Sequence, residues 1–271
     1  MIEIAESFLA GKYGDPARCE DAVVTTPSHV AVIDGATTEP GHEIDGRAPG
    51  RFAMEVVSAA IGKLDPGTDG PSAIRSLSRA VADALVERGV EPGKLASACV
   101  LIASTERREL WRVGNSTFAI DGQAHPQPWR LAEIPAEMRS AYLRALLRAG
   151  TTTPAEIARQ DPGRELIAPL LRLEHVFRNA VDAGELAYAA IDGLDVPEAM
   201  IEQVRVGPGS EIVFASDGYP LAAATLAEAE AYLQQSLAED PLRIHRHPEV
   251  RGVAEGQISY DDRAYLRFAI T

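Results

Sequence analysis

The sequence predicts an α+β fold, in a single domain that spans residues 1–271. Short apolar strands occur in neighbouring pairs near both ends of the chain, and helical patterns lie between these groups. The regular alternation of strand and helix that builds a parallel sheet is missing. Hydrophobic residues make up 46% of the chain and charged residues 24%, which is ordinary for a globular domain with its own core.

Apolar runs bounded by turn residues locate the strands. The segments VVTT and HVAVID lie within residues 23–34 and are separated by a Pro-Ser turn. The segments ACVLIAS and ELWRVGNSTFAI, within residues 98–120, are expected to pair as a hairpin, and Asp121-Gly122 closes the second of them with another tight turn. Further strands are expected at residues 185–191, 199–206, 212–215 and 264–270.

Helices are expected where apolar residues recur at helical spacing. These segments are residues 52–64, 74–85 and 226–238. Residues 132–178 are expected to form a mainly helical, arginine-rich flap inserted into the domain, with a capping box at Thr153 to Glu156. Three of its arginines, at positions 139, 144 and 148, follow helical spacing and are expected on a solvated face.

The charge balance limits the kinds of partner. Forty acidic residues against 26 basic ones give a net charge of −14, which argues against nucleic acid or an anionic membrane as a partner. The N-terminal segment is acidic and no apolar run approaches the about 18 residues that span a bilayer. Cys19 and Cys99 form no metal or redox pair, so reduced thiols and a cytoplasmic location are expected.

Acidic residues stand at the end or just before the beginning of four expected strands. They are Glu20-Asp21, Asp34, Asp217 and Asp261-Asp262. A single Asp-Gly after a strand is most often a turn, but four acidic sites favour a shared metal centre. Magnesium and manganese prefer such hard oxygen ligands, and two ions about 3.5–4 Å apart can activate water and hold a phosphoryl group.

Five segments in order resemble the metal-dependent protein phosphatases (PPM), the type-2C Ser/Thr phosphatases. They are ED at 20–21, VIDG at 32–35, WRVGNST at 111–117, IVFASDG at 212–218 and DDRAYLRF at 261–268. The resemblance covers nearly the whole chain. It implies a four-layer α-β-β-α sandwich, in which two antiparallel sheets flanked by helices hold a binuclear manganese or magnesium site.

The resemblance also assigns residues to that site. Asp34 corresponds to the carboxylate that bridges both metals, and the carbonyl of Gly35 would reach the second metal. Asp217 and Asp261 would complete the shell of the first metal, so that Asp34, Asp217 and Asp261 are the expected catalytic residues. Glu20 and Asp21 match the acidic pair that binds the second metal or its waters, and Asp262 has a supporting role.

Three positions depart from the family pattern. The motif whose aspartate helps to hold a third metal reads Gly114-Asn115-Ser116, so a third site is expected to be weak. Pro16 stands where the family has its phosphate-binding arginine, and Ala36 and Thr37 replace the histidine proposed as general acid. Other residues would have to take over phosphate binding. The candidates are Arg18, His42, Arg47 and Arg51.

By resemblance, the protein is expected to be a metal-dependent phosphomonoester hydrolase, most simply a protein Ser/Thr phosphatase. A hydroxide that bridges the two metals would attack phosphorus, and the substrate would be a phosphorylated protein. Two alternatives stay open. One is a catalytically weak, phosphatase-like module that binds a regulatory partner, and the other is a phosphatase of small phosphorylated metabolites.

Overall fold

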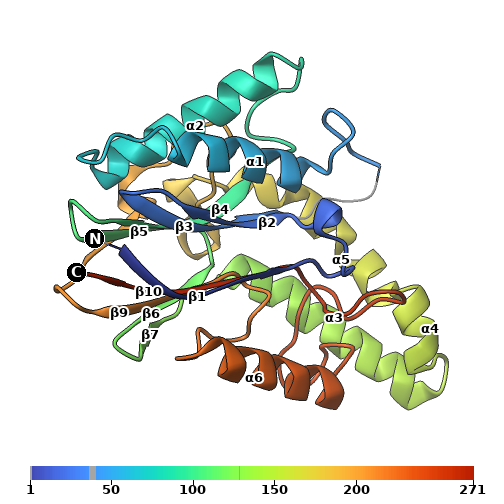
Figure 1. The fold of residues 1–271 in the computed structure, drawn as a ribbon. Coiled ribbons are helices and arrows are strands. Elements are labelled where there is room, and N and C mark those ends of the chain that lie inside the picture. Colours follow the sequence, from blue (N-terminus) through green and yellow to red (C-terminus); the bar gives the residue numbers. More distant parts are fainter. Residues whose placement is uncertain (1, 37–40, 128) are drawn as a thin grey trace.

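The structure is a computed structural model that describes residues 2–36, 41–127 and 129–271. Two five-stranded antiparallel sheets lie face to face, and helices cover both outer faces (Figure 1). This arrangement confirms the predicted four-layer sandwich. The first and last strands pair with each other, so the two ends of the chain lie side by side (Figure 1).

Each sheet contains strands from both halves of the chain. The first sheet has the order β1 (Ile2–Ala10), β10 (Arg263–Ile270), β9 (Glu211–Ala215), β6 (Thr117–Ile120) and β7 (Gln123–His125). The second has the order β2 (Asp21–Thr25), β3 (His29–Gly35), β4 (Ala98–Ser104), β5 (Glu109–Val113) and β8 (Glu202–Arg205).

The helices group around the sheets. The α-helices are α1 (Pro49–Ile61), α2 (Gly70–Val86), α3 (Arg130–Ala149), α4 (Pro154–Arg159), α5 (Pro162–Leu173) and α6 (Leu226–Glu239). Short 3₁₀ turns occur at η1 (Pro16–Arg18), η2 (Glu174–Phe177), η3 (Val181–Leu186) and η4 (Glu198–Met200). Within the described ranges, none of these helices combines the length and the apolar character needed to cross a bilayer.

Alternate side chains of the central strands pack into two separate hydrophobic cores. In β3, Val30 and Val32 point between the sheets, whereas Ala31 and Ile33 point toward α1 and α2. A strand that is buried on both faces reads as an unbroken apolar run, which is why β3 was visible in the sequence. On the other side, α6 packs its apolar face against the outer surface of β9 and β10 (Figure 1).

The run expected as one strand at residues 109–120 is two strands in different sheets, so that part of the hairpin prediction is wrong. The chain crosses from β5 to β6 at Gly114-Asn115-Ser116. Gly114 has φ +99, and a Cβ there would lie 2.2 Å from Sγ of Cys99. Only glycine fits such a crossing. The tight turn expected at Asp121-Gly122 is confirmed by the β6–β7 pairing.

Other differences occur where strands lie at sheet edges. Residues 185–191 contain the end of a 3₁₀ turn and two isolated bridges, from Tyr188 to Arg178 and from Ile191 to Ala98, so the strand expected there is absent. The strand expected at 199–206 is shortened to β8. Strand β1 was not expected, because charged residues alternate along an edge strand that is exposed over much of its length.

Helices α3, α4 and α5 fill most of the segment predicted to be helical, and the capping box at Thr153 is present. The prediction that all three arginines lie on a solvated face is wrong for one of them. Arg139 is 0% exposed, although Arg144 and Arg148 on the same helix are exposed as expected. Its guanidinium bonds Asp161 and backbone carbonyls of residues 242 and 249, so it joins α3 to α5 and to the loop before β10.

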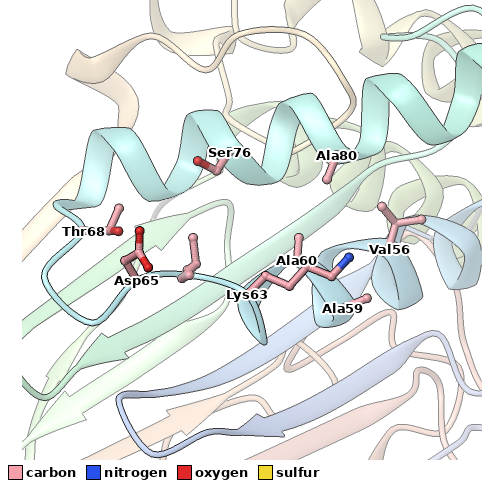
Figure 2. Close-up of a pocket in the computed structure, with 9 residues that line it drawn as sticks. Val56, Ala59, Ala60, Lys63, Asp65, Thr68, Ser76 and Ala80 are labelled. Carbon is pink, nitrogen blue, oxygen red and sulfur yellow. The ribbon is translucent and has the colours of Figure 1, made fainter.

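A hollow of about 440 Å³ lies between α1 and α2 (Figure 2). Small side chains such as Ala59, Ala60 and Ala80 face each other across it and leave the space open. None of the strand-end carboxylates lines this hollow. It is therefore separate from the site described next.

Candidate active site

The strand-end carboxylates from both sheets meet at one end of the sandwich. Asp21 begins β2 and lies directly opposite Asp34 near the end of β3. Asp217 follows β9 and Asp261 precedes β10, and these two strands are neighbours in the other sheet. The charges of Asp21, Asp217 and Asp261 all act on Asp34. Residues that are far apart in sequence thus form one acidic cluster.

The Asp-Gly pair after β9 has a specific structural cause. A Cβ on Gly218 would lie 1.9 Å from the carbonyl oxygen of Asp262, so the two backbones can touch only because residue 218 is glycine. The hydroxyl of Tyr260 donates to the carbonyl of Asp217 at 2.7 Å. This contact holds the end of β9 against the segment that leads into β10.

Asp21 is the buried member of the cluster, and Asp34 is half-buried beside it. Burial raises the pKa of both carboxyl groups well above their ordinary value, and the neighbouring aspartates raise it further. Asp21 is 3% exposed, and among the described residues its Oδ2 has no hydrogen-bond partner. A buried carboxylate oxygen without a donor is costly, and a bound cation would remove that cost.

Asp217 stands at the outer side of the same cluster. Its side chain is open to water on one side. Packing around the other side raises its pKa, and the charge of Asp261 adds to this rise. The amide of Asn115 donates to Asp217 Oδ2 at 2.9 Å. Asn115 therefore does more than close its own turn, since it holds a carboxylate from another strand in place.

Lys12 is a site residue that the sequence reasoning missed. Its Nζ lies 3.3 Å from Glu20 Oε2, 3.1 Å from Asp261 Oδ1 and 3.3 Å from Asp262 Oδ2. Burial opposes its charge, but these carboxylates outweigh burial and keep the pKa of Lys12 above its ordinary value. Lys12 lies two residues after the end of β1, and because β1 itself was not expected from the sequence, no strand-end pattern pointed to this lysine.

Asp261 and Asp262 belong to the part of the cluster around Lys12. Asp262 accepts from the backbone N–H of Lys12 at 2.7 Å and of Glu20 at 3.0 Å, so it ties three segments together. Arg251 Nη2 lies 3.2 Å from Asp261 Oδ2. Burial alone would raise the pKa of Asp261, but Arg251 and Lys12 outweigh it and hold this pKa below its usual value.

Only part of the cluster is suited to bind a divalent cation. Across the described residues, no three His, Cys, Asp or Glu side chains already converge as a closed ligand set. Asp21, Asp34 and Asp217 nevertheless offer hard oxygens that repel one another and carry raised pKa values, which suits magnesium or manganese. Glu20 and Asp261, by contrast, already bind protein cations.

Gly35, whose carbonyl the resemblance assigns to a metal, ends the strand that carries Asp34. It is the last residue of β3, directly after Asp34, and its N–H donates to the carbonyl of Glu20 at 3.0 Å. This bond joins the end of β3 to the segment that carries the acidic pair. Ala36 follows it, and Thr37, which the sequence reasoning paired with Ala36, lies outside the described residues.

Four side chains predicted to bind phosphate line one cavity next to the cluster. They are Arg18, His42, Arg47 and Arg51. Arg51 donates to Glu55 and to the carbonyls of residues 16 and 19, and Arg47 also pairs with Glu55. Arg18 is exposed, and its guanidinium lies over the ring of Tyr13 at 3.4 Å.

The two cysteines are free and buried. Burial is the main cause that raises the pKa of the Cys19 thiol to about 12, and the charge of Asp21 adds to it. These surroundings therefore favour the protonated thiol of Cys19 near neutral pH and do not activate it as a nucleophile.

The comparisons with known proteins agree with this architecture. No family model and no curated protein sequence matches the chain. Solved structures do match. The serine/threonine phosphatase PstP/Ppp of Mycobacterium tuberculosis aligns over 99% of this chain and 98% of its own, with a TM-score of 0.52 and 20% identity. The PstP catalytic domain in complex with two manganese ions aligns over 99% and 97%, with a TM-score of 0.50 and 18% identity.

These matches place the chain in a structural class. At this level of identity they establish the fold, and the fold is that of PPM-type Ser/Thr phosphatases. The resemblance that the five sequence segments implied is confirmed in that respect.

Proposed function

We propose that this protein is a cytoplasmic metal-dependent phosphatase that hydrolyses phosphoserine or phosphothreonine in proteins, with manganese or magnesium as cofactor. The observation that carries the proposal is the meeting of Asp21, Asp34 and Asp217 at the ends of three strands from both sheets. The burial of Asp21, the partial burial of Asp34 and the mutual repulsion of all three leave negative charge that a divalent cation would neutralise. The shared fold with metal-dependent phosphatases supports the same conclusion.

Each residue of the cluster has a distinct part in this proposal. A bound pair of divalent ions would supply an activated water and positive charge for the phosphoryl oxygens. Asp21 and Asp217 both interact with Asp34, which would hold both ions, while Asn115 fixes the direction of Asp217. Glu20, the Gly35 carbonyl and Asp261 complete the proposed ligand set.

Two protein cations lie at the border of the cluster. Lys12 and Arg251 both contact Asp261, from opposite oxygens of the same carboxylate. Both side chains also line the adjacent cavity, so they are placed to contact a phosphate group that enters from it. Pro16 stands at the family's position for a phosphate-binding arginine. We assign phosphate binding to Arg251 instead of to a residue near Pro16. Its guanidinium can bind a phosphate through two parallel hydrogen bonds.

Turnover of p-nitrophenyl phosphate and of a phosphothreonine peptide tests the proposal. Both should require manganese or magnesium and should stop with EDTA. An Asp65→Asn variant is the control for neutralising a carboxylate of the cluster, because Asp65 is an exposed carboxylate outside it. Turnover that survives exhaustive chelation contradicts the metal mechanism. Much faster turnover of small sugar or nucleotide monophosphates than of the peptide would favour a metabolite phosphatase.

A catalytically weak binding module is the second candidate. The observation that favours it is the ammonium of Lys12 amid Glu20, Asp261 and Asp262, which compensates charge that metals compensate in an active enzyme. Calorimetric titration with manganese separates the two candidates. Metal binding together with turnover supports the enzyme, and metal binding or phosphopeptide binding without turnover supports the module.

A further inference from the structure

A cavity of about 1090 Å³ opens beside the carboxylate cluster. It begins at Lys12, Glu20 and Arg251 and extends to α4, α5 and the loop after β3. Pockets for small molecules usually have about 300–1,000 Å³, so this cavity has room for more than a single phosphate ester. Its contact with the cluster means that a substrate bound at the carboxylates would also occupy the cavity.

The charge of the cavity wall is opposite to the charge of the protein. Among the described residues, nine basic and four acidic side chains line it. The whole chain has 26 basic and 40 acidic residues. The basic side chains are therefore concentrated at this place, and they create a local field that attracts anions.

Part of this positive charge is already used inside the protein. Arg139 is buried and pairs with Asp161, and Arg47 and Arg51 share Glu55. These three arginines hold the walls of the cavity together. They are not the groups that a ligand would meet first.

Arg164 is different, because only carboxylates beyond ion-pair distance, those of Glu174 and Asp161, offset part of its charge. Its guanidinium donates to the carbonyl of Val250 at 3.2 Å, and no carboxylate of the described chain lies within ion-pair distance. Arg251 approaches it from the neighbouring loop, and burial together with this second cation lowers the pKa of Arg164 to about 10. Two half-buried guanidinium groups that repel each other form a site for an anion.

Helix α5 directs this charge into the cavity. Asp161 caps the helix by accepting from the backbone N–H of Arg164, which fixes the first turn. Arg164, Ala168 and Arg172 follow at intervals of four residues, so they share one face, and all three line the cavity. The small side chain of Ala168 leaves space between the two arginines.

The outer part of the cavity carries two further cations. Arg18 is exposed, and within the described ranges it has no carboxylate at ion-pair distance. Arg159 lies 3.9 Å from Glu255, and both side chains are more than 60% exposed, so water screens this pair. Anionic groups spaced along a chain could therefore meet arginines from α5, α4 and η1 in turn.

We propose that this cavity binds the polypeptide segment beside the phosphorylated residue, and that this segment is rich in aspartate and glutamate. The proposal rests on the phosphatase function proposed above and names its substrate class, an acidic phosphoprotein. The phosphorylated side chain enters the carboxylate cluster past Arg251, and the flanking carboxylates pair with Arg164 and its neighbours. The binding is charge-based, so it weakens as salt rises.

Fluorescence anisotropy in EDTA measures the binding apart from turnover. The probes are phosphothreonine peptides with three flanking aspartates or three flanking alanines on each side. The acidic peptide should bind about tenfold more tightly in low salt, as expected for a few partly exposed charge pairs. This preference should shrink to about twofold in 0.5 M salt.

Two variants locate the effect. Arg164→Gln removes the charge but retains a donor toward Val250, and it should remove most of the preference for the acidic peptide. Arg164→Lys should retain part of it. Arg148→Gln makes the same charge change on an exposed residue outside the cavity and should leave the preference unchanged. Thermal melting shows whether each variant is folded.

The outcomes are distinguishable from those of the phosphatase test. Equal affinities for the two peptides, or equal effects of Arg164→Gln and Arg148→Gln, overturn the substrate class even if the protein is an active phosphatase. A single-stranded oligonucleotide that competes better than the acidic peptide also overturns it. A preference for the acidic peptide without any turnover supports the cavity assignment and contradicts the catalytic function instead.

Discussion

Two neighbouring groups of carboxylates compensate their charge in different ways. Glu20, Asp261 and Asp262 surround the ammonium of Lys12, and the pKa of Asp261 is held below its usual value. Asp21, Asp34 and Asp217 contact no protein cation at this distance among the described residues, and their pKa values are raised. The residue types are the same. The difference teaches that the positions of two cations, Lys12 and Arg251, decide which carboxylates remain available to an external cation.

Removal of Lys12 should have the largest effect on stability. Lys12→Met leaves three buried or half-buried carboxylates without their shared ammonium, and loss of one partner of a buried ion pair typically costs about 3–5 kcal/mol. Urea unfolding in EDTA measures the free energy of unfolding. Lys63→Met is the matched control, because Lys63 is exposed on the outer helix layer. Equal stability of the two variants would show that the Lys12 contacts are not formed in solution.

Neutralising an aspartate of the second group, Asp21, Asp34 and Asp217, should have the opposite effect on stability and a large effect on activity. Asp34→Asn removes one of the repelling charges, so the metal-free variant should be at least as stable as the wild type. Phosphatase turnover should fall by at least about a hundredfold, because a charged oxygen at the proposed metals becomes neutral. Melting in EDTA and p-nitrophenyl phosphate assays test both statements. Asp217→Asn should behave in the same way.

A large loss of metal-free stability in Asp34→Asn would instead make that residue a structural one. Full activity in both aspartate variants would remove the cluster from catalysis. The two groups of carboxylates would then differ only in burial.

The pH dependence of stability should also separate the groups. Since the pKa values of Asp21 and Asp34 are raised, the folded metal-free protein binds more protons than the unfolded chain above pH about 4. Its free energy of unfolding should therefore fall as pH rises, by up to about 1.4 kcal/mol per pH unit for each such proton. The contribution of Asp261 to the free energy of unfolding changes with pH in the opposite direction, since it is lost as pH falls through the lowered pKa of Asp261.

Urea unfolding between pH 5.5 and 8 measures this slope. Manganese should flatten it, because the ion replaces the protons, and Asp34→Asn should reduce it in EDTA. A slope of zero in EDTA for the wild type would contradict the raised pKa values.

The smallest effect is expected at Asn115. Its amide donates to Asp217, and Asn115→Asp replaces that donor by a carboxylate. The added charge should lower the manganese concentration needed for half-maximal activity by about threefold to tenfold, and it should lower the melting temperature in EDTA by a few degrees. Superimposable metal titrations of wild type and variant would show that residue 115 only orients Asp217.

The parts of this protein that could be predicted from sequence depend on local pattern. Strand β3 is an unbroken apolar run because both of its faces are covered, and α1 and α2 show the spacing of a one-sided helix. The acidic residues were found because each stands at the edge of such a run. Edge strands such as β1 alternate with charged residues, and their pattern is too weak to separate them from a loop.

What the sequence determined by itself is therefore most of the helices and buried strands, the α+β class and the identity of the strand-end carboxylates, since these follow from side-chain periodicity within a few residues. The tertiary structure alone decided that residues 109–120 divide between two sheets, that Arg139 is buried, and that Lys12 and Arg251 lie against Asp261. These facts depend on contacts between residues up to about 250 positions apart. Charge compensation is a property of distances in space, and a linear pattern of residue types does not contain those distances.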